Sequence, residues 1–157
     1  MVQVHLRPVT NDNVLECLAL ELEEAQAQFV ATNAKSLAQA AVNPALVPLA
    51  IYDAAARGFE QPPVPMIGFV LLELAAGVGF ILRLMIDKRY QRIGYGKAAM
   101  QEVVRRLRLY PQVEMVATSY QRGNEPAERL YQGLGFVPWK IAYAQDNPEE
   151  VYVRLAE

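Results

Sequence analysis

The amino-acid sequence predicts an α/β (α+β) domain with helices on the faces of one mixed sheet. Strand-like and helix-like segments follow in the order β-α-α-β-β-β-α-β-α-β-β, about seven strands and about four helices. The segment 78–87, "VGFILRLMID", is apolar on both faces, which is typical of a central strand. At 157 residues the chain is expected to form a single domain, 1–157, with a sizeable core.

The N-terminal part is expected to contain one strand and two helices. Residues 2–9, "VQVHLRPV", are predicted to form the strand, and Thr10 can cap the helix that follows. A second short helix is predicted around 33–41 and ends before Pro44. One stripe of the first helix is apolar and is expected to be buried. It consists of Val14, Leu15, Leu18 and Leu22.

The rest of the chain is predicted to supply five more strands besides 78–87, and two helices. Strands are expected at 46–54 and 65–74, and the proline-rich segment between them is a loop because proline donates no ladder hydrogen bond. A helix begins near Gly94, and its buried face consists of Ala98, Ala99, Val103 and Leu107. The remaining elements are a strand at 113–120, a helix at 124–135 and closing strands at 136–144 and 151–156.

Composition and charge indicate an ordinary soluble protein. Hydrophobic residues make up 53% of the chain and charged residues 20%. The net charge of −2 provides no basic field for nucleic acid or an anionic membrane. The basic run 105–109 lies at a helix C-terminus, where it complements the helix dipole, and is interpreted as solvated. No signal peptide or membrane-length apolar segment is recognisable, which favours the cytoplasm.

His5 and Cys17 are the only histidine and cysteine. This argues against Ser–His–Asp or Cys–His catalysis, against zinc sites built from several such residues, and against an internal disulfide. No metal site is expected. His5 is interpreted as structural, and Cys17 as a small buried hydrophobic residue.

The glycines of "QRIGYGK", residues 91–97, lie between the central strand and the next helix. The first-turn N–H groups of a helix lack intrahelical partners and lie at the positive end of its dipole. Gly94 and Gly96 would let these N–H groups reach phosphate oxygens without an intervening Cβ. The surrounding basic residues are Lys88, Arg89, Arg92 and Lys97. The motif alone fits a phosphate site and a glycine-softened corner equally well.

Two common nucleotide-binding motifs do not fit this turn. A Walker loop has Ser or Thr after its lysine, but Ala98 follows Lys97. A dinucleotide fingerprint has a third glycine, and Ala99 occupies that position.

A second motif, "NEPAERLYQGLGF" at 124–136, follows one strand and one loop later. Asn124, Ala127 and Tyr131 are three and four residues apart, so they share one helix face. Together the two motifs resemble [QR]-x-x-G-x-[GA] and N-x-x-A-x-x-x-Y-x-x-x-G-F of the GNAT superfamily of N-acetyltransferases. The resemblance covers residues 67–136 well and implies a GNAT-like, mostly antiparallel sheet. The matched positions are Gln91, Gly94, Gly96, Asn124, Ala127, Tyr131, Gly135 and Phe136.

The resemblance implies direct acetyl transfer from acetyl-CoA to an amine, without an acetyl-enzyme. Tyr131 would be the acid that protonates the leaving thiolate. A main-chain N–H of the central strand, freed by a bulge, would donate to the developing oxyanion. The residues expected to bind the coenzyme are Leu84, Met85, Ile86, Gln91, Arg92, Ile93, Gly94, Tyr95, Gly96, Lys97, Asn124 and Ala127.

The general base stays open at this point. Some relatives carry a glutamate on the central strand, but the comparable position here is Ile81 or a neighbour. Glu73 is the nearest carboxylate, and a pairing with Arg83 is an equally good explanation for it. Water relayed to Glu73, to Glu24 or to bulk solvent is an alternative to a dedicated base.

The acceptor is expected to be a small polyamine-like amine. The segment 21–40 is similar to one in bacterial spermine/spermidine acetyltransferases, through Phe29, Val30, Asn33, Ser36, Leu37, Ala38 and Ala40. A polycation needs carboxylates, for which the candidates are Glu21, Glu23, Glu24 and Asp87, and aromatic walls such as Phe29 or Tyr120. These glutamates equally fit the solvated face of an amphipathic helix.

Two alternatives remain beside polyamine acetylation. The acceptor can be a protein N-terminus, a lysine, an amino acid or an aminoglycoside. The chain can also be a catalytically silent acyl-CoA-binding module. Since the family is often dimeric, the resemblance also suggests a homodimer.

Overall fold

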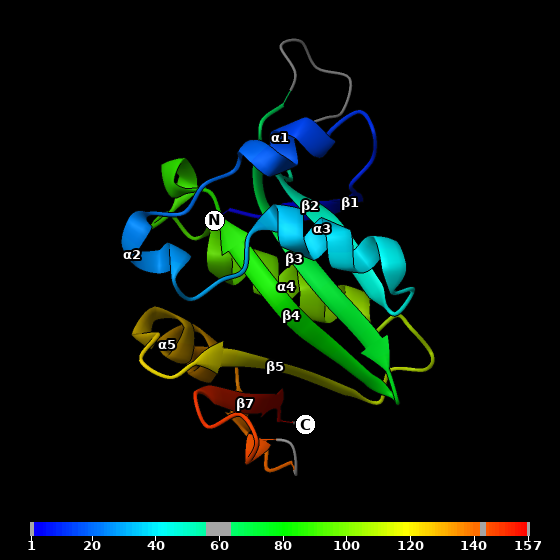
Figure 1. Cartoon of the computed structure of the whole chain (residues 1–157), viewed down its shortest axis with the longest axis vertical. Helices are drawn as coiled ribbons and strands as arrows, with labels where there is room; N and C mark the ends of the chain where they lie inside the picture. Colours follow the sequence, from blue (N-terminus) through cyan, green and yellow to red (C-terminus); the bar gives the residue numbers. More distant parts are fainter. Residues whose placement is uncertain (1, 56–63, 142–143, 157) are drawn as a thin grey trace.

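In the computed structural model, which describes residues 2–55, 64–141 and 144–156, seven strands form one sheet with helices on both faces (Figure 1). The strand order is β1-β2-β3-β4-β5-β7-β6, and every neighbouring pair is antiparallel except β4 and β5. The predicted fold class, with a mixed and mostly antiparallel sheet, is confirmed. The elements are β1 (Val4–Pro8), α1 (Val14–Ala19), α2 (Glu24–Ala27), α3 (Asn33–Val42), β2 (Leu46–Asp53), β3 (Met66–Ala75), β4 (Val78–Ile86), the 3-10 helix η1 (Lys88–Tyr90), α4 (Tyr95–Leu107), β5 (Met115–Gln121), α5 (Glu125–Gly133), β6 (Phe136–Pro138) and β7 (Glu150–Leu155).

Two apolar clusters lie on opposite faces of the sheet. On one face α4 and α5 pack against the sheet, and the predicted buried face of α4 is confirmed: Ala98, Ala99, Val103 and Leu107 are all in this cluster. On the other face α1 and α3 cover β2, β3 and the middle of β4 (Figure 1). Cys17 lies fully buried in this second cluster, as predicted. The molecule therefore has a face with α4 and α5, and a face with α3.

The first predicted helix is wrong in its extent and in its buried stripe. It is divided into α1 and α2, and Leu20 between them has an extended backbone. Leu15 is 78% exposed and Leu18 45% exposed, whereas Cys17 and Leu20 are buried. Helical periodicity alone therefore selects the wrong face here.

Contacts from distant residues explain why the helix stops. The carbonyl oxygen of Cys17, which a continuous helix would bond to the N–H of Glu21, instead accepts from the Asn33 side chain at 2.9 Å. The Glu21 N–H instead donates to the carboxylate of Asp87 at 2.9 Å. Tertiary hydrogen bonds thus replace the intrahelical one.

Thr10 is not the N-cap that the sequence indicates. The N-cap of α1 is Asn13, without a side-chain cap hydrogen bond. Thr10 forms the preceding turn, where its hydroxyl accepts the N–H of Asp12 and its carbonyl accepts the N–H of Val14.

The other predicted boundaries agree within a few residues, except for the strand predicted at 136–144. β6 ends at Pro138, and residues 142–143 of that prediction lie outside the described part of the chain. Most of the loop predicted between β2 and β3, residues 56–63, lies outside it as well.

Candidate active site

The sheet opens between β4 and β5, its two parallel neighbours. Their ladder begins at Val78 and stops where Ile81 pairs with Thr118. Beyond this pair the strands diverge toward α2 and α5 (Figure 1). A pocket of about 890 Å³ occupies the opening and is lined by α3, β3, β4, β5, α5 and β7. Segments far apart in the sequence therefore meet at this opening.

A β-bulge in β4 accompanies the opening. In the register of β3 with β4, Leu71 lies opposite Arg83. The next residue of β3, Leu72, lies opposite Ile81, so Leu82 is an extra residue on β4. A bulge bends its strand and increases the local twist. It also places Leu82 and Arg83 on the same side, the face covered by α3.

The open edge of β4 presents the main chain of Leu84 to the pocket. Asp87 donates its N–H to Ile67 of β3 at 2.9 Å. N–H groups of alternate residues in an antiparallel strand point the same way, so that of Met85 points to β3 and that of Leu84 points to the opening. Leu84 lines the pocket, whereas Met85 is buried in the α3-side cluster.

The glycine turn connects β4 to α4 through η1. Arg92 has a φ of 65° and Gly94 a φ of 101°, left-handed backbone that suits glycine and strains a residue with a Cβ. Gly94 is the N-cap of α4, and the Ala98 N–H donates to its carbonyl at 3.1 Å. The N–H groups of residues 95–97 precede this first intrahelical bond. They lie at the positive end of the dipole and can bind an anion.

Contacts within the protein do not require a glycine at position 96. A Cβ built on it would find only the Cδ2 of Leu130 within 4 Å, at 3.9 Å, which is ordinary contact. Alanine in its place would favour the helix by about 1 kcal/mol. The space above Gly96 is therefore open to a ligand, and Leu130, which also lines the pocket, connects this space to the opening.

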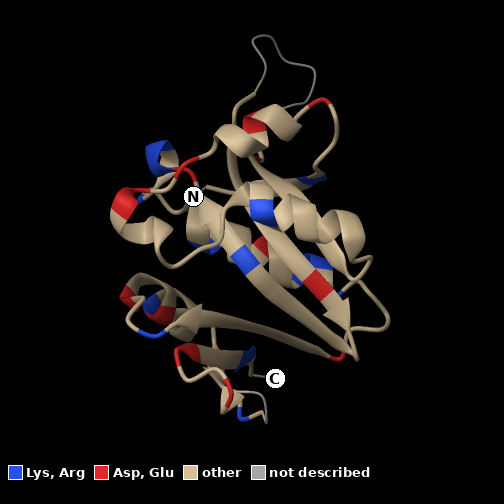
Figure 2. Ribbon diagram, in the orientation of Figure 1, with Lys and Arg blue, Asp and Glu red and all other residues tan. Residues whose placement is uncertain are grey.

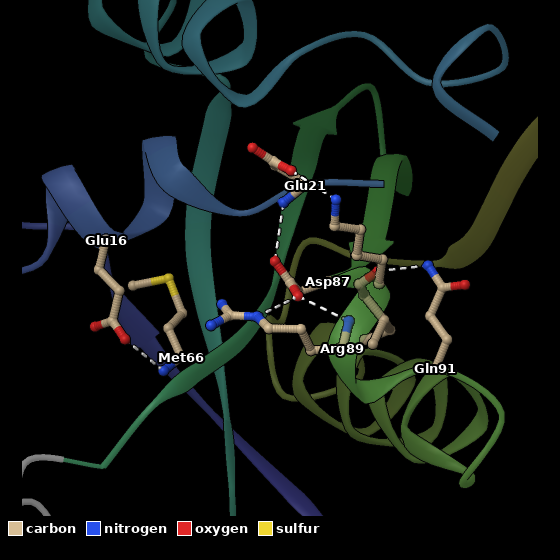
Figure 3. Close-up of polar contacts among 8 residues, drawn as sticks. Glu16, Glu21, Met66, Asp87, Arg89 and Gln91 are labelled. Atoms are coloured by element: carbon tan, nitrogen blue, oxygen red, sulfur yellow. Dashed lines mark hydrogen bonds and ion pairs between the residues drawn. The ribbon is translucent and has the colours of Figure 1, made fainter. Parts of the chain in front are cut away.

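The side chains of the turn contact the segment that contains α2. Gln91 exchanges two hydrogen bonds with Gln26, at 3.0 and 2.9 Å. Gln91 also donates to the carbonyl of Ile86 at 2.8 Å (Figure 3). Two ion pairs join the same segments, at 2.9 and 3.5 Å: Lys88 with Glu21 and Arg92 with Glu23. The Gln91 side chain thus shapes the turn, and the groups left that can bind an anion are main-chain N–H groups.

Asp87 is the buried anchor of this corner. Its carboxylate, 1% exposed, accepts the N–H of Glu21 and both the N–H and Nε of Arg89 (Figure 3). Burial by itself raises the pKa of Asp87, but these hydrogen bonds outweigh it and the pKa lies below its ordinary value. Glu21, Glu23 and Asp87, which the sequence suggests for an acceptor cleft, are therefore engaged in holding the turn.

The remaining turn residues are Ile93, Tyr95 and Lys97. Ile93 and Lys97 are exposed. The hydroxyl of Tyr95 donates to Asp53 at the end of β2, and this hydrogen bond together with burial raises the pKa of Tyr95 to about 12. The Tyr95 side chain anchors α4 to the sheet.

One face of α5 forms a wall of the pocket. Asn124 is its N-cap, and the Asn124 side chain accepts the N–H of Ala127 at 3.4 Å. Asn124, Ala127, Leu130 and Tyr131 all line the pocket. The predicted common face of Asn124, Ala127 and Tyr131 is thus present, and Asn124 also caps the helix.

Tyr131 lies beside the last pair of the parallel ladder. It is 9% exposed, and its ring packs against Tyr120 and Phe136 at centroid distances of 5.9 and 5.7 Å. Burial raises the pKa of Tyr131 to about 12, and a hydrogen bond with Thr118 acts in the opposite direction. The Thr118 hydroxyl donates to the carbonyl of Ile81 at 2.7 Å. The phenol is therefore a protonated donor at neutral pH.

Only some of the residues predicted to bind the acceptor lie on the side of the pocket near α3. Phe29 and Glu73 line it, whereas Glu24 is exposed on α2 and outside the lining. Tyr120 also lines the pocket, but on the side of Tyr131, with which its ring packs. Arg83 donates to Ser36 and Gln39 rather than pairing with Glu73.

The sequence profile described as the acetyltransferase (GNAT) family matches residues 21–136. The chain belongs to the GNAT acetyltransferase family. The matched segment contains the bulge, the glycine turn and α5, the features that surround the pocket of this GNAT protein.

Solved structures share the GNAT fold over almost the whole chain. AAC(6')-Ib in complex with paromomycin and acetyl-CoA superposes with a TM-score of 0.74 at 17% identity, covering 99% of this chain and 94% of that one. The PaiA N-acetyltransferase of Thermoplasma acidophilum in complex with coenzyme A gives 0.67 at 13%, covering 99% of each chain. Naa50 of Arabidopsis thaliana with a bisubstrate analogue gives 0.62 at 21%, covering 98% and 97%. No curated protein sequence matches the chain.

Two negative findings concern the described residues of this GNAT chain. None of their helices has the length and apolar character needed to cross a membrane. They contain no group of three or more His, Cys, Asp or Glu side chains able to hold a metal ion.

Several pocket residues of this GNAT chain escape sequence reasoning. Thr118, Lys35, Trp139 and Glu150 carry no local signal, because contacts between distant segments bring them to the opening. Arg83 does carry one. It is a single charge in the otherwise apolar strand 78–86, which indicates a polar partner or a ligand.

Proposed function

We propose that this GNAT protein binds acetyl-CoA and transfers its acetyl group directly to a primary amine. One observation carries the proposal: the opening between β4 and β5 gathers the outward N–H of Leu84 and the buried phenol of Tyr131 around one pocket, beside the first turn of α4. Direct transfer fits the state of Cys17. The thiol is fully buried, and burial raises its pKa to about 11, so it is unsuited to act as a nucleophile.

The first turn of α4 fits the pyrophosphate of the coenzyme. The main-chain N–H groups of residues 95–97 point out of the helix end, and Gly96 leaves the approach open. Lys97 adds an exposed positive charge to the same turn. A ligand held here can continue over Leu130 into the pocket, along Ala127 and Asn124. Precise positioning of this kind can supply ~7–11 kcal/mol in favourable cases.

Acetyl-CoA, when bound, supplies an activated acetyl thioester. The N–H of Leu84 would donate to the carbonyl oxygen as negative charge develops there. Removing one such donor elsewhere costs about 2.7–4 kcal/mol. Because β5 has diverged at this point, the N–H of Leu84 is available to a ligand.

Tyr131 would act on the leaving sulfur. With a pKa of about 12, its phenol is a weaker acid than a thiol near ~8.5, so complete proton transfer is uphill by ~5 kcal/mol in the ligand-free site. Tyr131 therefore stabilises the sulfur mainly by a hydrogen bond while its charge develops. Thr118 lies next to the phenol and orients it.

The amine must reach the pocket as a neutral nucleophile. Glu73 lines the pocket and is suitably placed to accept a proton, directly or through water. Glu24 lies outside the lining, which favours Glu73 or bulk solvent over Glu24.

The acceptor class is a small primary amine. The sequence favours a polyamine, supported by Phe29 and by the carboxylates of Glu73 and Glu150 in the pocket lining. Arg83 and Lys35 line the same pocket and repel a polycation. The charges of the pocket therefore favour an amino-acid-like acceptor over spermidine or spermine.

The proposal is tested by following release of the free thiol of coenzyme A from acetyl-CoA with spermidine, spermine, lysine and short peptides. Amine-dependent thiol release and an acetylated product identified by mass are expected. If coenzyme A binds in calorimetry but no amine gives thiol release, the chain is a non-catalytic acyl-CoA-binding module and the proposal is wrong.

A further inference from the structure

The side of the pocket near α3 contains two cations without a carboxylate partner among the described residues. Arg83 and Lys35 both line the pocket, and neither occurs in the ion pairs of this part of the chain. Figure 2 shows a basic segment on α3 and another on β4, with an acidic segment on the neighbouring strand β3. These two cations are free to bind an anionic group of a ligand.

Arg83 is fixed by α3 through neutral partners. Its Nη1 donates to Ser36 Oγ at 3.1 Å and to Gln39 Oε1 at 2.6 Å. A guanidinium has five N–H groups, so Nε and Nη2 retain three donors in a rigid, planar arrangement. Burial lowers the pKa of Arg83, which reflects loss of hydration that these neutral contacts do not fully replace. An oriented guanidinium with remaining donors is suited to a bidentate carboxylate.

The direction of Arg83 separates it from the coenzyme phosphates. The bulge at Leu82 turns Arg83 to the face covered by α3. Tyr131 and the buried residues of α4, including Ala98, belong to the cluster on the opposite face. An anion held at the first turn of α4 therefore lies on the other side of the sheet from Arg83.

We propose that the acceptor carries a carboxylate beside its amine, and that Arg83, assisted by Lys35, binds this carboxylate. The inference rests on the proposed acetyl transfer and specifies its substrate class: an amino acid or short peptide. Glu150 lines the same pocket and receives the second ammonium group of a diamino acid such as lysine, while Glu73 stays available to accept the proton of the reacting amine.

The first test compares lysine with cadaverine, which differs from it by loss of the carboxylate. Hydrogen bonds to charged groups correspond to roughly 10- to 100-fold in binding. Lysine is therefore expected to give a kcat/KM higher than cadaverine by a factor in this range, measured as thiol release at saturating acetyl-CoA.

The second test changes the cations. Arg83→Gln is expected to raise the KM for lysine by about the same factor, while the KM for acetyl-CoA stays within about twofold and the kcat/KM for cadaverine does not fall. Lys35→Met, at an exposed position that tolerates substitution, is expected to raise the KM for lysine several-fold. Arg108→Gln removes the same charge at the exposed C-cap of α4 and is expected to change neither value.

A binding measurement makes the test independent of turnover. Trp139 is the only tryptophan of the chain and lines the pocket. Its fluorescence therefore reports lysine and cadaverine binding in the presence of coenzyme A. Lysine is expected to bind more tightly, and Arg83→Gln is expected to remove the difference.

The outcomes separate this inference from the proposed function. Thiol release that is equal for lysine and cadaverine, or equally reduced by Arg83→Gln for both, keeps the transferase and overturns the carboxylate site. An Arg83-dependent preference in fluorescence without any thiol release keeps the site and overturns the transferase. If neither thiol release nor an Arg83-dependent preference is observed, both the carboxylate site and the transferase are overturned.

Discussion

Gln26 and Gln91 exchange two hydrogen bonds between their side-chain amides, at 3.0 and 2.9 Å, and so join α2 to the turn before α4. Residues 29–31, which follow α2, line the pocket on its proposed acceptor side. The turn leads into the proposed pyrophosphate site. This amide pair therefore connects the two proposed substrate sites through the protein.

Replacing Gln26 tests this connection. Gln26→Ala removes both hydrogen bonds and is expected to destabilise the fold by about 1–2 kcal/mol, since each contributes about 1 kcal/mol net. Because the turn loses a support, the Kd for coenzyme A is expected to rise several-fold in calorimetry. Gln101→Ala, at an exposed position of α4, is the matched control. A loss of stability without a change in Kd would limit the pair to a structural role.

Gly96 and Gly94 are expected to respond in opposite ways to alanine. Gly96→Ala fits the space and improves helix propensity, so stability should stay the same or rise by up to about 1 kcal/mol. The added methyl group obstructs the phosphate approach, and affinity for coenzyme A should fall at least about tenfold. Gly94→Ala must adopt a φ of 101°, so thermal unfolding should show a loss of about 1–2 kcal/mol. Unchanged coenzyme affinity in Gly96→Ala would exclude the turn as the pyrophosphate site.

Tyr131→Phe isolates the phenol. We expect kcat to fall far more than the KM for either substrate, because the hydrogen bond acts as charge develops on sulfur. Since the pKa of Tyr131 is about 12, its ionisation should not reduce kcat below about pH 10. Steady-state kinetics between pH 7 and pH 10 at about constant ionic strength test both points. A variant with an unchanged kcat would remove Tyr131 from the mechanism.

Asp87→Asn tests the buried anchor through pH. The pKa of Asp87 is below its ordinary value of 3.8, so its carboxylate stabilises the fold above about pH 4 and this contribution is lost as pH falls further. The variant should be less stable at pH 7 by about 1–3 kcal/mol. The difference from the wild type should shrink below about pH 4, as measured by urea unfolding. Asp12→Asn, at an exposed site, should show no such pattern.

The sequence predicts the parts of the site that depend on local spacing. The strand–turn–helix signal at 91–97 and the three- and four-residue spacing of Asn124, Ala127 and Tyr131 follow from helix geometry and backbone chemistry. Residues close in sequence keep their relative positions in almost any fold that preserves the helix. These features are therefore readable without a structure.

The parts that escape prediction depend on contacts between distant segments. α1 ends where it does because Asn33 and Asp87, far away in sequence, take over its hydrogen bonds. Glu21 and Glu23 appear as free carboxylates in the sequence, and only the position of the turn shows that they pair with Lys88 and Arg92. The pocket charges of Lys35 and Arg83 depend on the register of β4, which one bulge shifts.

The extra residue Leu82 is needed for the opening between β4 and β5 but not for folding of the sheet. Because Leu82 and Arg83 face the same way, a chain lacking Leu82 would keep Ile81 and residues 83–86 on their present faces and in their present register with β3. No core side chain would change sides, so such a chain should still fold. Its fourth strand would run straight beside the fifth, and the gap that admits two substrates would narrow. Deletion of Leu82 should thus yield a folded protein with an intact sheet that no longer transfers the acetyl group.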